Sequence, residues 1–317
     1  MGPFVMHWQG VFPAVTTQFK ADQSLDLAAT ARHIEVLIES GVDGLIMCGS
    51  LGENQTLTAD EKRRVVETTV RAAEGRVPVL SGVAEMSTAA ACEYARDCQR
   101  LGADGLMVMP AMVYRADDRE ALNHFRRVAA ATALPWMLYN NPIGYPVDIT
   151  PPLLAELADL DTLVAVKESS GNTRRITEIR LTLGDRFALF VGVDDLLLEA
   201  AVLGIDGWVA GAGLAFPREN QYFWKLTREG RWDEAREIYR WFSPLLRLDT
   251  HLKFVQYIKL AVQEAGLGAE WVREPRMPLV GAERERVLAI VRRGIETRPA
   301  FPSPQPSPGN TSAINMQ

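Results

Sequence analysis

Eight short apolar runs that alternate with helix-like stretches are the feature that most limits how this chain can fold. Parallel strands that are covered on both faces read as continuous apolar runs. The runs lie at about residues 11–19, 44–49, 77–84, 105–110, 135–142, 163–169, 187–194 and 206–213. Eight strand–helix units predict an α/β fold of the (β/α)8 TIM barrel type. A doubly wound sheet would more often carry a Gly-rich dinucleotide loop after its first strand, where residues 16–19 read Thr-Thr-Gln-Phe.

A tetrapeptide of the form Gly-x-Asp-Gly occurs three times at the joints between these units. It begins at Gly41, Gly102 and Gly204, each time after a helical pattern and before an apolar run. The first glycine suits the C′ position of a helix, where φ is positive. The repeat therefore predicts three helix-to-strand joints of one kind.

Further helices are expected after the barrel, which we place at residues 8–216. Residues 217–296 carry helical patterns, for example at 232–246 and 251–264. They predict a helical extension that either packs on the barrel or makes an oligomer contact. Residues 297–317 are rich in Pro and Ser, which predicts a disordered tail.

Composition argues against several classes of protein. The net charge of −6 and the lack of a Lys/Arg block argue against a nucleic-acid surface. No apolar stretch approaches the roughly 18 residues of a membrane span. The start of the chain does not read as a secretory signal, and three cysteines without metal-ligand spacing fit a reducing cytoplasm. The four histidines are scattered, so we expect no metal site.

Lys167 is the strongest candidate for a chemically active side chain. It lies near the end of the run at 163–169, where strand alternation places it on the same face as Leu163 and Ala165. An ammonium group aimed into an apolar interior costs several kcal/mol unless it is paired or neutralised. A lowered pKa would relieve that cost and make the amine a nucleophile toward carbonyl carbons. From the run alone, a structural lysine reaching out to water is the alternative.

Two more candidates follow strands at the face where barrels of this type carry their active sites. Tyr139 ends the fifth run, and Ser50 lies in the turn Gly-Ser-Leu-Gly-Glu at residues 49–53. The backbone N–H groups of such a turn can hold a carboxylate, and the Ser50 hydroxyl can pass a proton. The alternatives are that Tyr139 serves only in packing and that the turn at 49–53 only connects two elements.

Several polar residues near these runs are expected to have structural roles. Glu168 should point toward the helices, and Glu53 should brace its turn through hydrogen bonds. Asp194 and Asp195 are expected to cap the helix that follows them. Trp208 either lines the pocket or fills the barrel.

Taken together and in this order, the motifs resemble the dihydrodipicolinate synthase/N-acetylneuraminate lyase superfamily of Schiff-base barrel enzymes. The resemblance covers about residues 8–295. It is carried by the opening at 10–17, the turn at 49–53, Tyr-Asn-Asn-Pro at 139–142, Val-Lys-Glu at 166–168 and Gly-Val-Asp-Asp at 192–195. The set is specific for the superfamily but not for one substrate.

The resemblance implies a role for each matching residue. Lys167 would form an imine with the keto carbon of a 2-oxo acid, Tyr139 would shuttle the adjacent proton, and Ser50 would link two tyrosines and bind the substrate carboxylate. The family's second tyrosine, supplied by a neighbouring subunit, falls near Tyr114. The other substrate-binding positions would be Leu51, Gly52, Gly192 and Val209. A protonated imine is itself an electron sink, so no cofactor is expected.

Two departures from the family pattern bear on the substrate. Leu51 replaces the second hydroxyl residue of the turn. Residues 142–146 lack the arginine with which dihydrodipicolinate synthases grip the second substrate's carboxylate. The missing arginine favours elimination of a C4 substituent, which needs no second carboxylate clamp. Leu51, with Ile143, predicts a less polar pocket than a polyhydroxylated sugar acid would need.

We therefore predict a catabolic 2-oxo acid lyase, with Δ1-pyrroline-4-hydroxy-2-carboxylate deamination in hydroxyproline degradation as the first interpretation. The alternatives are a 2-keto-3-deoxy sugar acid dehydratase or aldolase, and dihydrodipicolinate synthase. From other classes, the alternatives are a non-catalytic 2-oxo acid sensor and a phosphate-binding barrel. The resemblance also implies a homotetramer built as a dimer of dimers that acts on a 2-oxo acid or cyclic imine. The charge and the apolar pattern predict no nucleic-acid or membrane partner.

Overall fold

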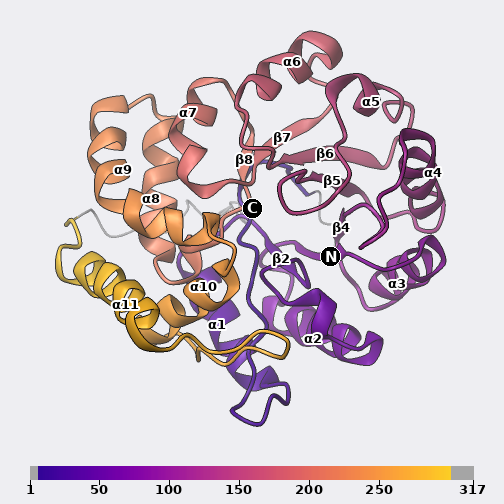
Figure 1. Cartoon of the computed structure of the whole chain (residues 1–317). Helices are drawn as coiled ribbons and strands as arrows, with labels where there is room; N and C mark the ends of the chain where they lie inside the picture. Colours follow the sequence, from indigo (N-terminus) through magenta and orange to yellow (C-terminus); the bar gives the residue numbers. More distant parts are fainter. Residues whose placement is uncertain (1–5, 301–317) are drawn as a thin grey trace, which may run out of the picture.

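A computed structural model describes residues 6–300 and shows eight parallel strands inside a ring of helices (Figure 1). The strands are β1 (Gly10–Val11), β2 (Leu45–Met47), β3 (Val79–Val83), β4 (Gly105–Val108), β5 (Trp136–Asn140), β6 (Leu163–Glu168), β7 (Ala188–Val191) and β8 (Gly207–Trp208). They form one sheet in the order β1-β8-β7-β6-β5-β4-β3-β2. A parallel bridge from Ala14 to Ile46 joins the chain just after β1 to β2, so the two ends of the curled sheet meet. The predicted α/β class is confirmed.

Between residues 6 and 300, eight α-helices follow the strands in turn, and three more α-helices come after them. The first eight are α1 (Leu27–Glu39), α2 (Ala59–Ala73), α3 (Thr88–Arg100), α4 (Asp118–Ala129), α5 (Pro151–Ala155), α6 (Arg174–Leu183), α7 (Leu197–Val202) and α8 (Pro217–Arg228). The last, α8, contacts β1 and α7 and thereby completes the ring. The predicted end of the barrel at residue 216 thus falls just before its eighth helix.

The C-terminal helices predicted from the sequence are present. They are α9 (Trp232–Leu246), α10 (Phe254–Glu264) and α11 (Gly281–Glu296), and they gather on one side of the ring beside α8 (Figure 1). The bounds of α9 agree with the prediction. The next helix starts three residues later than expected, because residues 251–253 form a bend and a turn after a short 3-10 helix, η4 (Arg247–Thr250). No helix between residues 6 and 300 has both the length and the apolar character needed to cross a membrane. Most of the tail predicted to be disordered, residues 301–317, lies outside the described part of the chain.

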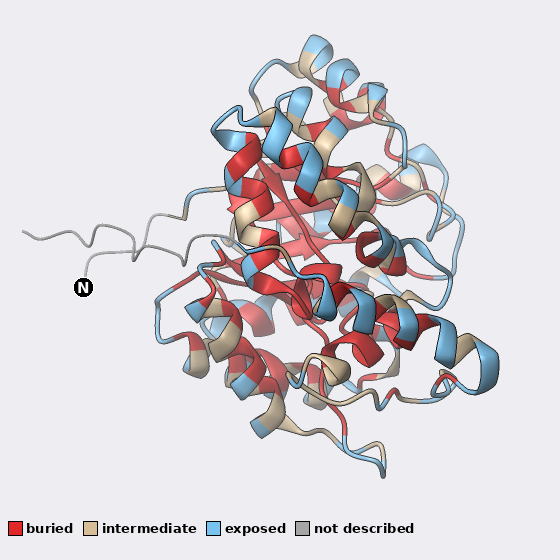
Figure 2. Cartoon of the chain, turned by 90° about the vertical axis from the view of Figure 1, so that its left-hand side faces the viewer, coloured by how far each residue is buried: buried red, intermediate tan, exposed pale blue. Residues whose placement is uncertain are grey.

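The strands are buried in the core, and the helices turn exposed faces outward (Figure 2). Trp208 is fully buried, and its Nε1 donates a hydrogen bond of 3.0 Å to Asp194. It therefore fills the barrel rather than lining a pocket.

The repeated Gly-x-Asp-Gly joints confirm the expected helix ends and reveal a role for the aspartate. The first glycines have φ of +87° at Gly41 and +83° at both Gly102 and Gly204. Each aspartate carboxylate accepts a backbone N–H from the preceding strand: Asp43 from Val11 at 2.8 Å, Asp104 from Val79 at 2.9 Å and Asp206 from Leu189 at 2.8 Å. The repeat thus ties three helix-to-strand joints to neighbouring strands.

Candidate active site

A cavity of about 380 Å³ opens at the carboxyl ends of the strands. Its walls come from residues at or just past the strand ends and from the segment between α9 and α10. The wall residues used in the argument below are Ser50, Leu51, Tyr139, Ile143, Lys167, Gly192, Val209, Gly211 and Asp249. The structure thus brings together six of the predicted site residues: Lys167, Tyr139, Ser50, Leu51, Gly192 and Val209.

Lys167 places its amine inside this cavity. It pairs in register with Tyr139 across β5 and β6, and its Nζ lies 3.9 Å from the centre of the tyrosine ring. Burial lowers the pKa of Lys167 to about 8, although the negative charges of Asp249 and Asp194 oppose that shift. A substantial fraction of the amine is therefore neutral near neutral pH, which is the form that attacks carbonyl carbons.

Gly192 makes room for the lysine. A Cβ atom built on Gly192 would lie 2.3 Å from Cε of Lys167 and 2.2 Å from Oγ of Ser169. Such distances are far inside van der Waals contact, so any side chain here would displace the lysine. The absence of a side chain at Gly192 therefore leaves the space that Lys167 and Ser169 occupy.

Tyr139 offers a phenol beside the amine. Its oxygen accepts a hydrogen bond of 3.0 Å from Nδ2 of Asn141. Burial raises the pKa of Tyr139 to about 12, with the hydrogen bond from Asn141 opposing the shift. A positive charge formed next to the ring would favour the phenolate and so allow the oxygen to take a proton.

The sequence analysis missed Tyr145 as a site residue. Its hydroxyl forms a short hydrogen bond with the Ser50 hydroxyl, and its ring packs edge-on to Tyr139 with centroids 6.0 Å apart. Ser50 is therefore linked to a tyrosine of the same chain. The signal in the sequence is its place three residues beyond the Tyr-Asn-Asn-Pro motif, in the same stretch that lacks the arginine.

The turn that carries Ser50 has the backbone geometry of an anion seat. Cys48 and Glu53, which flank it, have φ of +52° and +58°, a region that non-glycine residues seldom adopt. Within residues 6–300, the N–H groups of Ser50 and Leu51 donate to no other group. Free N–H groups on a tight turn can hold a carboxylate.

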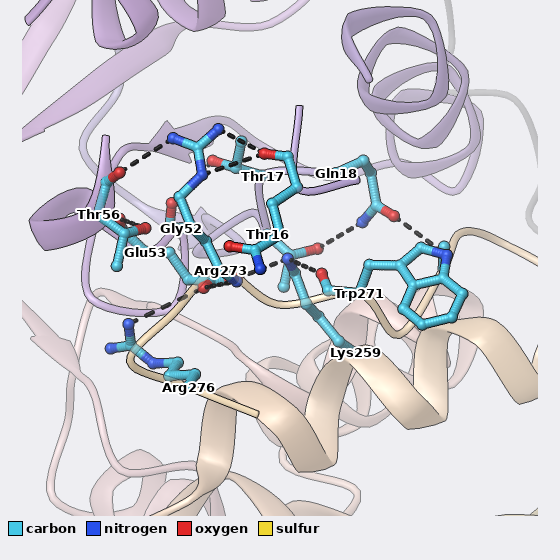
Figure 3. Close-up of polar contacts among 12 residues, drawn as sticks. Thr16, Thr17, Gln18, Gly52, Glu53, Thr56, Lys259, Trp271, Arg273 and Arg276 are labelled. Carbon is cyan, nitrogen blue, oxygen red and sulfur yellow. Dashed lines mark hydrogen bonds and ion pairs between the residues drawn. The ribbon is translucent and has the colours of Figure 1, made fainter. Parts of the chain in front are cut away.

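Glu53 braces this turn, as expected, rather than facing the cavity (Figure 3). Its carboxylate accepts from Nζ of Lys259 at 2.5 Å and from the backbone N–H of Arg273 at 3.0 Å. Both side chains of the ion pair are fully buried. The C-terminal extension therefore holds the Ser50 turn in place.

The carboxylates next to the motifs are also structural, with one correction. Glu168 accepts hydrogen bonds from Asn140 and from the N–H of Ser170, and it does not line the cavity. The prediction that Asp194 and Asp195 cap the following helix is wrong, because the N-cap of α7 is Leu196 without a side-chain cap. Asp194 does not cap the helix because its carboxylate accepts hydrogen bonds from donors on β8 and just after it.

Asp194 turns to those donors. It accepts from the indole of Trp208, the N–H of Gly211 and the N–H of Ala212, the last at 2.6 Å. Burial raises its pKa to about 6, and these three donors oppose the shift. The carboxylate thus fixes the loop that forms the cavity wall after β8.

Two predicted site residues lie outside the cavity wall. Gly52 is a buried residue of the turn itself, and its carbonyl accepts from the Thr17 hydroxyl. Tyr114 is 59% exposed, and its hydroxyl donates to Glu120. Its predicted entry into a neighbouring active site stays a prediction. Within residues 6–300, no three His, Cys, Asp or Glu side chains converge as metal ligands would.

A buried, partly neutral lysine at the strand ends of such a fold, beside a tyrosine, defines a class of enzyme: a lyase that works through a lysine Schiff base. The chain belongs to the dihydrodipicolinate synthetase family, whose model matches residues 7–293. The resemblance noted from the motifs is thereby confirmed.

Relatives and solved structures agree with this assignment. The chain is 34% identical to 4-hydroxy-tetrahydrodipicolinate synthase of Methanothrix thermoacetophila, over 86% of this chain and 92% of that protein. It is 33% identical to the enzyme of the same name from Methanospirillum hungatei, over 90% and 99%. Dihydrodipicolinate synthase from Aquifex aeolicus superposes with a TM-score of 0.86 at 29% identity, covering 90% and 97%. A prophage protein of the family from E. coli K12, solved in complex with pyruvate, gives 0.85 at 29% identity, covering 90% and 98%.

Proposed function

We propose that this protein forms an imine between Lys167 and the keto carbon of a 2-oxo acid. The observation that carries the proposal is the Lys167 amine, buried in the cavity and with its pKa lowered to about 8. The pyruvate complex of the E. coli relative supports a 2-oxo acid as ligand. No metal or organic cofactor enters this chemistry.

Each neighbouring group has a task in the reaction that we propose. The neutral amine attacks C2, water leaves, and the protonated imine acidifies the protons on C3. Tyr139 takes one of those protons, because the new positive charge beside its ring favours the phenolate. The Ser50 and Tyr145 hydroxyls extend the proton path, and the N–H groups of Ser50 and Leu51 hold the carboxylate.

The relatives put one reaction first. Two that share at least 33% of their residues with this chain are named 4-hydroxy-tetrahydrodipicolinate synthase. This favours a condensation of that type, which the sequence analysis held only as an alternative, over the deaminase that it put first. Hydroxyproline degradation has no support from these relatives.

An elimination remains the second candidate on one specific observation. No arginine lines the cavity among the described residues, and Leu51 and Ile143 contribute apolar wall at the positions noted from the sequence. Loss of a hydroxyl or amino group from C4 requires no clamp for a second carboxylate. Both candidates share every step up to removal of the C3 proton.

The experiment that tests the proposal is borohydride trapping with pyruvate, read by peptide mass spectrometry. We expect a reduced adduct on the peptide that contains Lys167, and none in Lys167→Ala. Lys259 is an internal control, because its pKa is also lowered to about 8 but it is ion-paired and outside the cavity. An adduct on Lys259, or none on Lys167 with pyruvate or larger 2-oxo acids, would refute the proposal.

Turnover assays then separate the candidates. The panel is pyruvate with aspartate semialdehyde, Δ1-pyrroline-4-hydroxy-2-carboxylate, and a 2-keto-3-deoxy sugar acid. Turnover of the first mixture alone would support condensation, and turnover of either of the others alone would support elimination or aldol cleavage.

The predicted homotetramer is also a proposal. Val113 and Tyr114 are 78% and 59% exposed next to one another, which suits burial against a second copy. Sedimentation velocity of the wild type and of Val113→Asp tests it. A monomeric wild type would refute the oligomer. An oligomer of unchanged size in Val113→Asp would mean that the contact between copies lies elsewhere.

A further inference from the structure

Asp249 brings a carboxyl group into the wall of the cavity that holds Lys167. It belongs to η4, in the C-terminal extension, rather than to a strand end. The steps proposed above leave it without a task, and no local pattern in the sequence marks it. Its surroundings nevertheless set it apart from the other buried carboxyls.

The carboxyl packs against the backbone just past β8. A Cβ atom built on Gly211 would lie 2.2 Å from Oδ1 of Asp249 and 2.4 Å from its Cγ. The N–H of the same glycine donates to Asp194. Two carboxyls therefore contact Gly211: Asp194 accepts from its N–H, and Asp249 packs against its Cα in the space where a side chain would lie.

The two carboxyls differ in their partners. Asp194 accepts from three donors, whereas Oδ1 of Asp249 is buried and makes no hydrogen bond within residues 6–300. A buried oxygen without a partner costs about 1–3 kcal/mol. Structural carboxylates are normally satisfied. An unsatisfied carboxyl in the wall of a reaction cavity is suited to a hydrogen bond with the ligand, as acceptor when it is ionised and as donor when it is protonated.

Nearby polar groups are engaged elsewhere. The guanidinium of Arg247 lies 3.6 Å from the carboxylate of Asp195. The hydroxyl of Thr250 donates to the carbonyl of Arg247. His251 stacks on Tyr257, and its Nδ1 accepts the N–H of Lys253.

The charges around Asp249 favour its protonated form. Burial raises the pKa of this carboxyl well above its usual value, and the negative charges of Asp194 and Asp195 raise it further. The positive charge of Lys167 acts in the opposite direction. The charge of Asp249 in turn raises the pKa of Tyr139 and of Lys167. The three groups are therefore electrostatically coupled within one cavity.

We propose that Asp249 is a further catalytic residue, which delivers a proton to the oxygen or nitrogen atom on C4 of a substrate bound at Lys167. This inference rests on the imine chemistry proposed above. It applies to both candidate reactions, because each creates negative charge on that atom.

In a condensation, the electron pair of the enamine forms the C3–C4 bond to an aldehyde carbon. The π pair of the aldehyde moves onto its oxygen, which takes the Asp249 proton and becomes a hydroxyl. In an elimination, Tyr139 takes the C3 proton, and the C–H pair forms the C2=C3 bond of an enamine while the imine π pair moves onto nitrogen. The nitrogen pair then re-forms the imine, the C2=C3 π pair shifts to C3=C4, and the C4–X bond breaks with its pair on X, which takes the Asp249 proton and leaves as water or an amine. In both cases the Asp249 carboxylate recovers a proton from Tyr139 or solvent, so the cycle balances.

The test compares Asp249→Asn and Asp249→Ala in two reactions. The first is exchange of the C3 protons of pyruvate with deuterium, followed by NMR, which needs the imine and Tyr139 but has no C4 atom. The second is turnover of whichever C4-bearing substrate of the panel the wild type uses. Asp195→Asn is the matched control, because this carboxyl lies outside the cavity wall and pairs with Arg247.

We expect exchange to stay within about threefold of wild type in both Asp249 variants, while kcat of the second reaction falls about 100- to 10,000-fold. Asp195→Asn should change neither. Turnover by Asp249→Asn within threefold of wild type would overturn the inference. An equal fall of both reactions would also overturn it, because Asp249 would then only support the fold of the site. Failure of wild-type pyruvate trapping is a separate result, since it would remove the imine chemistry itself.

Discussion

Lys167 and Tyr139 face each other on paired strands, with the amine 3.9 Å from the centre of the ring. The π face attracts a cation, so the ring favours the charged amine and the protonated imine alike. Burial acts against the charge, and burial is the largest influence on the pKa of Lys167. The protonated and the neutral forms of Lys167 are therefore both populated near neutral pH, and the neutral form is the nucleophile.

The first prediction concerns the pH dependence of imine formation. With its pKa lowered to about 8, roughly a tenth of Lys167 is neutral at pH 7, against well under a thousandth for an ordinary lysine. The neutral fraction increases with pH, so the initial rate of adduct formation should rise about tenfold from pH 7 to 9 and then level off. Pulses of pyruvate at each pH, quenched with borohydride at one common pH, measure this. A rate that rises about 100-fold from pH 7 to 9 and continues to rise above pH 9 would indicate an unperturbed lysine.

The second prediction separates the hydroxyl groups. Tyr139→Phe should slow C3 deuterium exchange of pyruvate by about 100-fold or more, because it removes the proposed base. Ser50→Ala and Tyr145→Phe should slow it less, by about tenfold, because they extend the proton path without touching C3.

Pyruvate trapping on Lys167 should survive in all three hydroxyl variants, which shows that the imine still forms. If Tyr139→Phe exchanged protons at the wild-type rate, another group would be the base. Equal losses in Tyr139→Phe and Tyr145→Phe would instead make the two phenols act as one unit.

The third prediction concerns Gly192. Its replacement by Ala places a methyl group where Cε of Lys167 lies, so the amine must move. We expect trapping and turnover to fall together by about 100-fold, since misplacement of a reacting group by about 1 Å has effects of that size. Gly75→Ala is the stability control, because nothing lies within 4 Å of its Cβ position and its positive φ brings only local strain. Full trapping by Gly192→Ala would mean that the loop after β7 yields instead of the lysine.

The sequence was sufficient for the architecture because apolar runs and helix patterns are local. The class, the eight parallel strands, the α9 bounds and the glycine conformations at the joints all follow from residues close in the chain. The lengths of the strands, by contrast, do not follow from the local sequence. The run predicted at 11–19 became the two-residue β1, because the residues after it make only isolated contacts with the sheet, such as the bridge from Ala14 to Ile46, and the Thr17 hydroxyl donates to the carbonyl of Gly52.

Contacts between distant segments explain what the sequence left out of the site. Asp249 lies far along the chain from Lys167, and only packing of the extension on the barrel places both in one cavity. Asp194 looked like a helix cap because a local rule fits it, but the N–H groups past β8 supply more donors. Local patterns identify reactive residue types, whereas the partners that tune them come from the fold.

The last prediction concerns the ion pair that holds the Ser50 turn. Lys259 and Glu53 are fully buried, and Lys259 also donates to the carbonyl of Trp271 at 2.7 Å. Lys259→Met should lower the free energy of unfolding by about 3–5 kcal/mol, because it leaves a buried carboxylate with one partner fewer. Lys225→Met is the matched control, since that amine is exposed and lies 3.8 Å from the carboxylate of Glu229. Its loss should cost less than about 0.5 kcal/mol.

Urea unfolding of the two lysine variants measures both effects, and the double variant Glu53→Gln with Lys259→Met tests the cause. If the cost comes from the uncompensated carboxylate, the double variant should be more stable than Lys259→Met alone. A double variant less stable than either single one would mean that packing of the lysine stem, rather than its charge, holds the extension to the turn. Because the Ser50 turn rests on Glu53, Lys259→Met should also weaken binding of the 2-oxo acid carboxylate, seen as a higher pyruvate concentration for half-maximal trapping.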